Sequence, residues 1–319
     1  MIFVFKCFSY LPLWLAHGVG AALGWLVFML SPTYRGRFLS NSEQAGYTFS
    51  AVKGAIASSG RMVAELPKLW MSSAGKAQGK AEASFTWRGK EHIEAAYATG
   101  KGVIFLTPHL GSFEMIGQAW GQDFGPNSKH NRGNFTVLFR PARKAWMAQL
   151  VANSRNRPGL ATVPTNLSGV RQMIKALRKG EAVGLLPDQV PPDGMGLWTL
   201  FFGKSAYTMT LAARLSAQTG ATVLVGFGER LSFGQGYVLH IYPLKQALSD
   251  DLDTAVLQMN VEMEALIRRC PTQFLWGYGR YKQPRKEAET KEKAKEVVKE
   301  LAQEVAKKVA KKVAKEVAE

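Results

Sequence analysis

Short apolar runs alternate with amphipathic stretches through the middle of the chain, a pattern typical of an α/β domain. The apolar runs predict buried strands at 103–106, 135–139, 182–186, 222–227 and 237–242. Amphipathic periodicity predicts helices at 167–178, 207–218 and 252–269, and polar, glycine-containing connections are expected at 60–79 and 121–133. We therefore predict an α/β fold with a mixed central sheet flanked by helices, an N-terminal membrane-anchoring helix and a C-terminal helical tail.

The N-terminal thirty residues are almost continuously apolar, and the 20 residues from Leu11 to Leu30 carry no formal charge. As a helix they would extend roughly 30 Å, the thickness of one hydrocarbon core. We predict a retained anchor. An in-plane amphipathic insertion is one alternative. A cleaved signal peptide is the other, but only Lys6 precedes the segment as a basic residue, and no small-x-small cleavage site follows it.

Residues 286–319 are almost entirely Lys, Glu, Ala and Val. Apolar residues recur there at every fourth position, so their stripe drifts around a 3.6-residue helix too fast for a long coiled-coil seam. We interpret the segment as a solvated helical tail, an appendage without a part in function. The predicted organisation is an anchor at 1–31, a main α/β domain at 32–284 and the tail at 285–319.

The chain of 319 residues is strongly basic, with 41 Lys and Arg against 24 Asp and Glu and a net charge of +17. Ten lysines and eight glutamates lie in 286–319, so the tail contributes +2 and the rest of the chain keeps +15. Such a charge indicates an anionic partner, either nucleic acid or anionic lipid. The two cysteines, Cys7 and Cys270, cannot build a disulfide scaffold, which favours a reducing compartment.

The sharpest local feature is a histidine that follows the strand predicted at 103–106. His109 lies in the turn after that strand, and Glu114 lies in the first turn of the helix that we expect to begin near Ser112. Open α/β sheets bind their ligands at this edge. An imidazole with one nitrogen held by a carboxylate presents the other nitrogen as a general base. A loop histidine capped by a nearby acid is the simpler alternative.

Two other kinds of chemistry are disfavoured by spacing. The chain has no G-x-S-x-G element, and Ser112 is too close to His109 for a confident nucleophile, which argues against an acyl-serine intermediate. H-E-x-x-H is also absent, and the remaining histidines are scattered along the sequence. We therefore expect no metal.

Further motifs follow the H-x-x-x-x-E of His109 and Glu114 in a fixed order. They are Phe139-Arg140-Pro141, Arg155 with Gly159, Leu186-Pro187-Asp188-Gln189, Phe201-Phe202-Gly203 with Thr208, and the segment 275–282 that contains Arg280. Over most of 1–284 this order resembles the lipid A late acyltransferases, the lauroyl and myristoyl transferases of lipopolysaccharide synthesis, within the lysophospholipid acyltransferase superfamily.

The resemblance implies transfer of a fatty acyl chain from a thioester of acyl carrier protein or coenzyme A to a hydroxyl of a lipid A precursor. His109 would be the general base and Glu114 would fix its tautomer, with no cofactor and no covalent intermediate. The expected location is the bacterial inner membrane. More basic residues follow the apolar segment than precede it, which places the catalytic domain on the cytoplasmic face. Anionic inner-membrane lipids and the acidic carrier protein would match the basic charge.

The remaining candidate residues divide by role. The amides of Gly111 and Ser112, with Arg140, are candidates to stabilise the oxyanion. Arg155 and Arg280 suit the phosphates and acidic sugars of the acceptor. An acyl-chain wall is expected from three aromatic residues, Trp198, Phe201 and Phe202.

Asp188 and Gln189 follow the strand predicted at 182–186, at the same kind of strand end as His109. They are expected to orient Arg140, His109 or the acceptor, with a simple turn as the alternative.

Two other functions remain open. A related acyltransferase that acts on a glycerolipid or another glycolipid would keep the histidine and change only the acceptor contacts. A membrane-tethered nucleic-acid-binding protein is the other class. The chain contains no recognised DNA or RNA motif, so we expect no nucleic acid partner.

Overall fold

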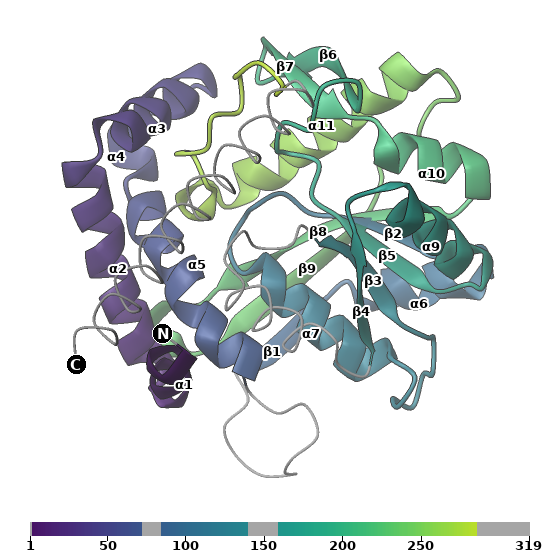
Figure 1. Ribbon diagram of the computed structural model, residues 1–319, viewed down its shortest axis with the longest axis horizontal. Coiled ribbons are helices and arrows are strands. Elements are labelled where there is room, and N and C mark those ends of the chain that lie inside the picture. Colours follow the sequence, from purple (N-terminus) through teal and green to yellow (C-terminus); the bar gives the residue numbers. More distant parts are fainter. Residues whose placement is uncertain (1, 72–83, 140–158, 286–319) are drawn as a thin grey trace, which may run out of the picture.

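The computed structural model describes residues 2–71, 84–139 and 159–285, and a seven-stranded sheet forms the centre of that part (Figure 1). The strand order is β1-β9-β8-β2-β5-β3-β4. All neighbours run parallel except β8 and β9, so the predicted mixed sheet is confirmed. The strands are β1 (Phe85–Arg88), β2 (Val103–Leu106), β3 (Phe135–Phe139), β4 (Leu160–Pro164), β5 (Ala182–Leu185), β8 (Thr222–Arg230) and β9 (Tyr237–Pro243).

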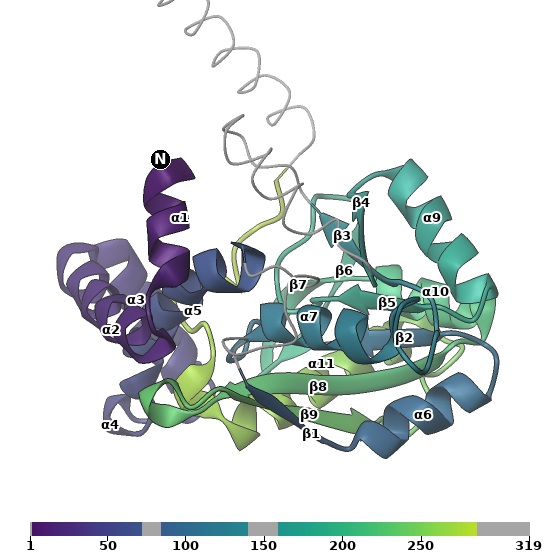
Figure 2. The ribbon, with the colours of Figure 1, turned by 90° about the horizontal axis from the view of Figure 1, so that it is seen from below.

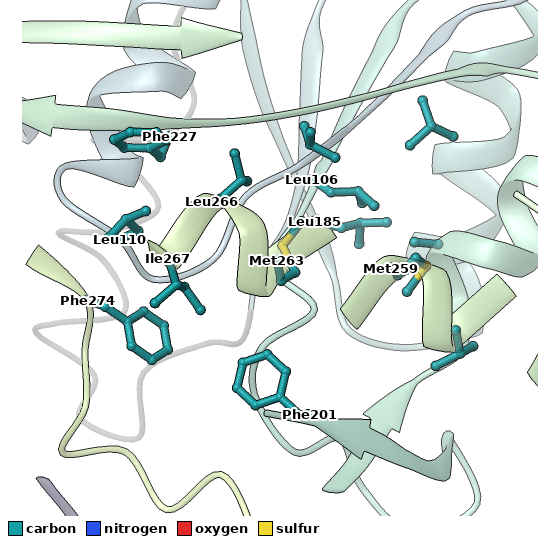
Figure 3. Packing of buried hydrophobic residues seen from close by; sticks show 14 of the residues in the cluster. Leu106, Leu110, Leu185, Phe201, Phe227, Met259, Met263, Leu266, Ile267 and Phe274 are labelled. Carbon is teal, nitrogen blue, oxygen red and sulfur yellow. The ribbon is translucent and has the colours of Figure 1, made fainter. Parts of the chain in front are cut away.

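Helices cover both faces of the sheet, which explains why β2 and β5 are buried along their whole length. Phe105 on β2 faces a cluster formed with α6 and α7, whereas Leu106 faces α9, α10 and α11. Figure 3 shows the hydrophobic cluster on the Leu106 side of the sheet, where Met263 and Leu266 of α11 lie beside Leu106. The helices are α6 (Lys90–Ala98), α7 (Phe113–Phe124), α9 (Leu167–Arg178), α10 (Leu211–Thr219) and α11 (Leu252–Arg269).

A separate antiparallel hairpin is formed by β6 (Gly196–Phe201) and β7 (Lys204–Met209). The helix predicted at 207–218 is therefore wrong at its start. Tyr207 pairs with Trp198 in the hairpin, and the helix α10 begins only at Leu211. Two short 3-10 turns lie at Ser232–Gly234 and Pro271–Gln273.

The N-terminal helices form one flank of the molecule (Figures 1 and 2). They are α1 (Ile2–Tyr10), α2 (Leu13–Leu30), α3 (Pro32–Gln44), α4 (Phe49–Val52) and α5 (Gly54–Met71). By length and composition α2 is long and apolar enough to cross a membrane. The connection predicted at 60–79 is wrong for 60–71, because these residues form the second half of α5 and bury Ala64 and Leu69. The tail at 286–319 lies outside the described residues.

Candidate active site

The loop from Thr107 to Ser112 carries His109 from the end of β2 to the start of α7. Because β2 lies between β8 and β5, this loop sits at the carboxyl edge in the middle of the sheet. Gly111 has a φ of +59°, and a Cβ there would collide with the carbonyl of Gly228. The glycine therefore allows the loop to pass directly against β8.

His109 is held by the carboxylate of Asp188. Its ring Nδ1 lies 2.8 Å from Oδ1, and its backbone amide donates to Oδ2 at 2.9 Å. Asp188 comes shortly after β5, the parallel neighbour of β2, so the two strand ends bring the residues together. Since an ionised carboxylate only accepts hydrogen bonds, Nδ1 carries a proton and donates it to Asp188. The Nε2 atom then accepts from the side-chain amide of Gln189 at 3.1 Å.

Asp188 is ionised despite its burial. Burial alone would raise the pKa of this carboxyl, but the attraction of His109, the two hydrogen bonds from His109 and the charge of Arg280 lower the pKa below its ordinary value. Arg280 is itself buried, and it donates to the carbonyl of Tyr207 at 2.7 Å and to Thr208 Oγ1 at 2.6 Å. Instead of facing an acceptor phosphate, as predicted, Arg280 fastens the C-terminal segment to β7 and supplies positive charge near Asp188.

A cavity of about 390 Å³ adjoins His109. Polar groups enter it from His109, Glu114, Gln189, Thr107 and Thr165. The rest of its lining is mainly apolar and comes from Phe105, Phe113, Ile116, Phe135, Val137, Leu138, Leu160, Leu185, Leu186, Val190, Pro191 and Met209. Cavities of this size and character hold apolar ligands with a few oriented polar contacts.

Glu114 lines the same cavity but has a different contact from the predicted one. Its Oε2 accepts a hydrogen bond from the indole of Trp70 at 3.2 Å. Both ring nitrogens of His109 are engaged by Asp188 and Gln189. The carboxylate that fixes the tautomer is thus supplied by the neighbouring strand end. The expectation that Glu114 would do so followed from its closeness in sequence.

The predicted oxyanion amides are already used. Gly111 donates to the carbonyl of Gln273 at 3.1 Å, and Ser112 donates to the carbonyl of Gly228 at 2.7 Å. These bonds fasten the histidine loop to β8 and to the C-terminal segment, so neither amide is directed at a substrate. Arg140 and Arg155 lie outside the described residues.

The predicted acyl-chain wall lies elsewhere. Phe201 and Phe202 are buried in the core, where Phe202 packs near Trp276, and Trp198 packs on Tyr207 with 44% of its surface exposed. None of the three lines the cavity beside His109. The hairpin geometry explains this, because β6 and β7 pair with each other and pack on α11 instead of extending the central sheet.

Sequence reasoning missed the residues that do line the cavity. Phe135 and Val137 alternate along β3 and so share one face of the sheet with Phe105 of β2. That alternation was a usable signal, since β2 and β3 were both predicted as strands. Trp70, at the end of α5, is a further missed residue because it donates a hydrogen bond to Glu114, and its sequence carries no local signal of that contact. Within the described ranges, no group of three or more His, Cys, Asp or Glu side chains is arranged to hold a metal ion.

The fold and site are those of an α/β protein in which an imidazole, held by a buried carboxylate at the sheet's carboxyl edge, could accept a proton beside an apolar cavity. Residues 2–283 match the family described as bacterial lipid A biosynthesis acyltransferase, and the chain belongs to that family. The resemblance drawn from the motifs is confirmed.

Curated relatives carry related names. A lipid A biosynthesis acyltransferase of Haemophilus influenzae is 28% identical over 189 residues, which are 59% of this chain and 56% of the relative. A lipid A biosynthesis palmitoleoyltransferase of Escherichia coli is 28% identical over 199 residues, 62% of this chain and 61% of the relative. A phosphatidylinositol mannoside acyltransferase of Mycobacterium tuberculosis is 26% identical over 170 residues, 51% and 49% of the two chains. The matches thus span about half to three fifths of these relatives' lengths.

Proposed function

We propose that this protein transfers a fatty acyl chain from an acyl thioester to a hydroxyl group of a lipid A precursor. The observation that carries the proposal is the contact of His109 with Asp188 beside an apolar cavity. Membership of the lipid A acyltransferase family supports both the reaction and the acceptor class. The apolar lining suits the fatty chain, and the histidine suits the hydroxyl that must lose its proton.

The proposed reaction needs one base and no covalent bond between the acyl chain and the protein. His109 Nε2 takes the proton from the acceptor hydroxyl as the oxygen attacks the thioester carbonyl. Asp188 holds the imidazole in the required tautomer and stabilises the imidazolium that forms. As the tetrahedral intermediate collapses, the C–S bond breaks and the proton passes from His109 to the leaving thiolate. A thioester is already activated, so the reaction requires no cofactor.

Gln189 is proposed to mark the position of the acceptor hydroxyl. Its amide donates to the same Nε2 atom that would receive the proton. When the hydroxyl takes that place, the amide becomes available as a donor to the developing oxyanion. Glu114 lines the same cavity and is proposed to orient the acceptor.

Acyl carrier protein is the proposed donor. Four basic side chains are exposed on and just after α9, namely Arg171, Lys175, Arg178 and Lys179. The carrier protein is strongly acidic, so this helix would steer its approach. The proposed location is the cytoplasmic face of the inner membrane, where the basic chain suits anionic lipid.

The test is an assay of the full chain with acyl carrier protein thioesters and lipid IVA, read by mass spectrometry. We expect the acceptor to gain one ester-linked chain, and His109→Ala to abolish that gain. A fully active His109→Ala would contradict the mechanism. The Mycobacterium tuberculosis relative favours a second acceptor class, so a phosphatidylinositol mannoside and a glycerol phosphate are offered in parallel. Acylation of either one in place of lipid IVA would replace the proposed acceptor.

A further inference from the structure

The helix α2 is apolar on two opposite faces. One face is buried against the protein and includes Ala16, Gly20, Gly24 and Phe28. The other face is exposed and equally apolar, with Trp14, Leu23, Leu26, Val27, Met29 and Leu30 on it. A surface helix of a protein in water carries polar residues on its outer face. The outer face of α2 therefore requires an apolar cover.

Close backbone contact joins α2 to α5. A Cβ on Gly60 would collide with the backbone of Gly20, and a Cβ on Gly24 would collide with the carbonyl of Ile56. Small residues at these positions let the two helices approach to backbone distance. Because the contact runs along both helices, α2 cannot move relative to the protein without α5.

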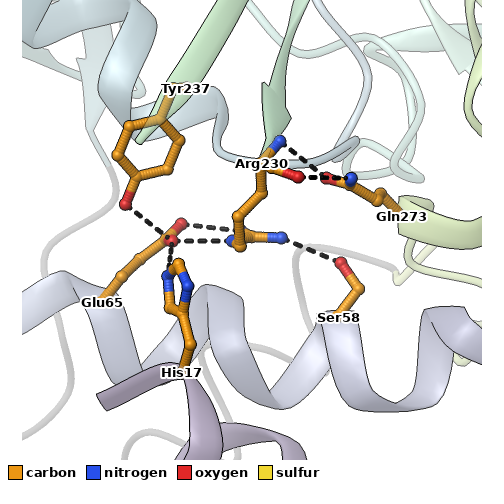
Figure 4. A network of polar contacts seen from close by, with 6 residues as sticks. All are labelled: His17, Ser58, Glu65, Arg230, Tyr237 and Gln273. Carbon is orange, nitrogen blue, oxygen red and sulfur yellow. Dashed lines mark hydrogen bonds and ion pairs between the residues drawn. The ribbon is translucent and has the colours of Figure 1, made fainter. Parts of the chain in front are cut away.

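A buried polar network ties both helices to the sheet (Figure 4). His17 of α2 contacts Glu65 of α5 at 3.1 Å, and Glu65 pairs with Arg230 of β8 through two contacts of 2.8 and 2.7 Å. Tyr237 of β9 donates to the same carboxylate at 3.0 Å. The α2 helix is thus fixed lengthwise along α5, against the β8–β9 side of the sheet in the domain that contains His109.

Both ends of α2 also contact the protein. Near its N-terminus, Lys68 donates to the carbonyl of Leu11 at 3.0 Å. Near its C-terminus, Phe28 packs against Phe38 and Phe49 with ring centroids 5.5 and 5.9 Å away. If α2 crossed a bilayer, its whole length would carry α5 and the Glu65–Arg230 pair to hydrocarbon depth. Charged groups at that depth are strongly unfavourable.

A second exposed apolar point lies beside the start of α2. Phe233, at the turn between β8 and β9, is 88% exposed and has a φ of +52°. The next residue, Gly234, lies against the backbone of Trp14. Phe233, Tyr10 and Trp14 therefore expose aromatic rings around one end of α2, although Phe233 comes from a distant part of the chain. Aromatic residues of this kind favour the interface between lipid headgroups and hydrocarbon.

We propose that α2 lies in the plane of one leaflet of an anionic bilayer and does not cross it, and that Phe233 inserts beside it as a second contact. The outer face of α2 then meets lipid along its whole length, while the polar network stays above the hydrocarbon. The net charge of the chain favours an anionic surface. This arrangement fixes the height of the His109 cavity above the leaflet, whatever acceptor the site uses.

Probe depth along α2 distinguishes the two arrangements. Single cysteines at Trp14, Ala22 and Leu30, in a Cys7→Ser background, are labelled with a fluorophore in the full chain, since Cys270 is buried. The labelled protein is placed in vesicles of phosphatidylethanolamine and phosphatidylglycerol that contain nitroxide lipids. We expect all three probes at shallow depth, with Ala22 deeper than the other two by no more than the radius of a helix, ~5 Å. A crossing helix would place Ala22 about 12 Å deeper than the other two, at ~1.5 Å per residue. That gradient would overturn the proposal. Absence of quenching at all three positions would also overturn it, because a second copy of the chain would then cover the outer face of α2.

The turn contact is tested with Phe233→Asn, because asparagine tolerates a positive φ and removes the ring without backbone strain. We expect its binding to the same vesicles to weaken at least several-fold. The matched control is Leu167→Asn, which changes an apolar residue that is 77% exposed at the start of α9. Equal vesicle binding by Phe233→Asn and the unaltered chain would overturn the role of the turn.

Discussion

His109 contacts the carboxylate of Asp188 twice, through its ring Nδ1 and its backbone amide, although the residues are 79 positions apart. The two contacts do different things. The ring contact selects the tautomer, whereas the amide contact fixes the loop that carries the ring. Asp188 is buried, and its pKa is lowered, so it stays a carboxylate at neutral pH. It can therefore accept both hydrogen bonds from His109 without a change of charge.

Replacing Asp188 by asparagine is expected to lower kcat by up to about 10⁴-fold with little change in fold. The amide keeps the shape but no longer selects the tautomer or stabilises the imidazolium, and losses of this size follow that change in histidine–carboxylate pairs. Steady-state assays with circular dichroism measure both quantities. Glu114→Gln is the comparison, and its loss is expected mainly in the KM for the acceptor. The reverse ranking of the two variants would return the tautomer-fixing role to Glu114.

Removal of the Gln189 side chain tests the proposed oxyanion donor. Gln189→Ala is expected to lower kcat by about 10²- to 10³-fold, the range found when one such donor is lost. The thermal unfolding midpoint should hardly change. Within the described part of the chain, the Gln189 side-chain amide has a hydrogen-bond contact with one side chain, that of His109. Gln189→Glu keeps the length and replaces the donor by an acceptor, so it should be no more active than Gln189→Ala. An alanine variant with normal kcat would exclude the role.

The parts of the fold predicted from sequence are those with a strong local signal. β2 and β5 are continuous apolar runs because both faces are covered, and α11 shows a clear helical period over 18 residues. β1 was missed because it is a four-residue edge strand whose side chains alternate between exposed and half-buried positions. The sequence predicts a helix from Tyr207 because the end of β7 leads almost directly into α10, and the two apolar patterns merge.

The site was predictable in part for the same reason. His109 was found because a histidine after a buried strand has a fixed place in an open sheet. The carboxylate partner of His109 depends on which strand lies beside β2. The sequence around His109 does not predict that strand order. Asp188 is therefore one of several residues that the sequence offers, while closeness in sequence and the H-x-x-x-x-E resemblance both favour Glu114. The bonds of Gly111 and Ser112 to distant backbone carbonyls were invisible for the same reason.

The stability of the protein should depend on the ionisation of Glu65. Burial alone would raise the pKa of this carboxyl, but the charge and hydrogen bonds of Arg230, with His17, lower the pKa to about 2 from 4.5. A folded-state pKa below the unfolded one contributes stability above about pH 4.5 that is lost as the pH falls toward 2. The size of this contribution is ~3 kcal/mol, an order-of-magnitude figure.

The measurement is the difference in unfolding midpoint between the unaltered chain and Glu65→Gln in detergent. At pH 7 the variant should be clearly less stable, because Arg230 loses its buried counter-charge. The difference should shrink as the pH is lowered from 5 to 2. A difference that stays constant over this range would show that Glu65 is not the titrating group.

The contact between α2 and α5 can be tested with two glycines that differ in their surroundings. Gly60→Ala is expected to destabilise the protein by about 1–3 kcal/mol, because the new methyl group meets the backbone of Gly20 and the helices must separate. Gly18→Ala is the matched control on α2, where nothing lies within 4 Å of a Cβ and alanine favours the helix by up to about 1 kcal/mol. Unfolding midpoints in detergent measure both. If the two variants unfold alike, the helices are not held at backbone distance, and the lengthwise fixation of α2 that keeps it in one leaflet loses its basis.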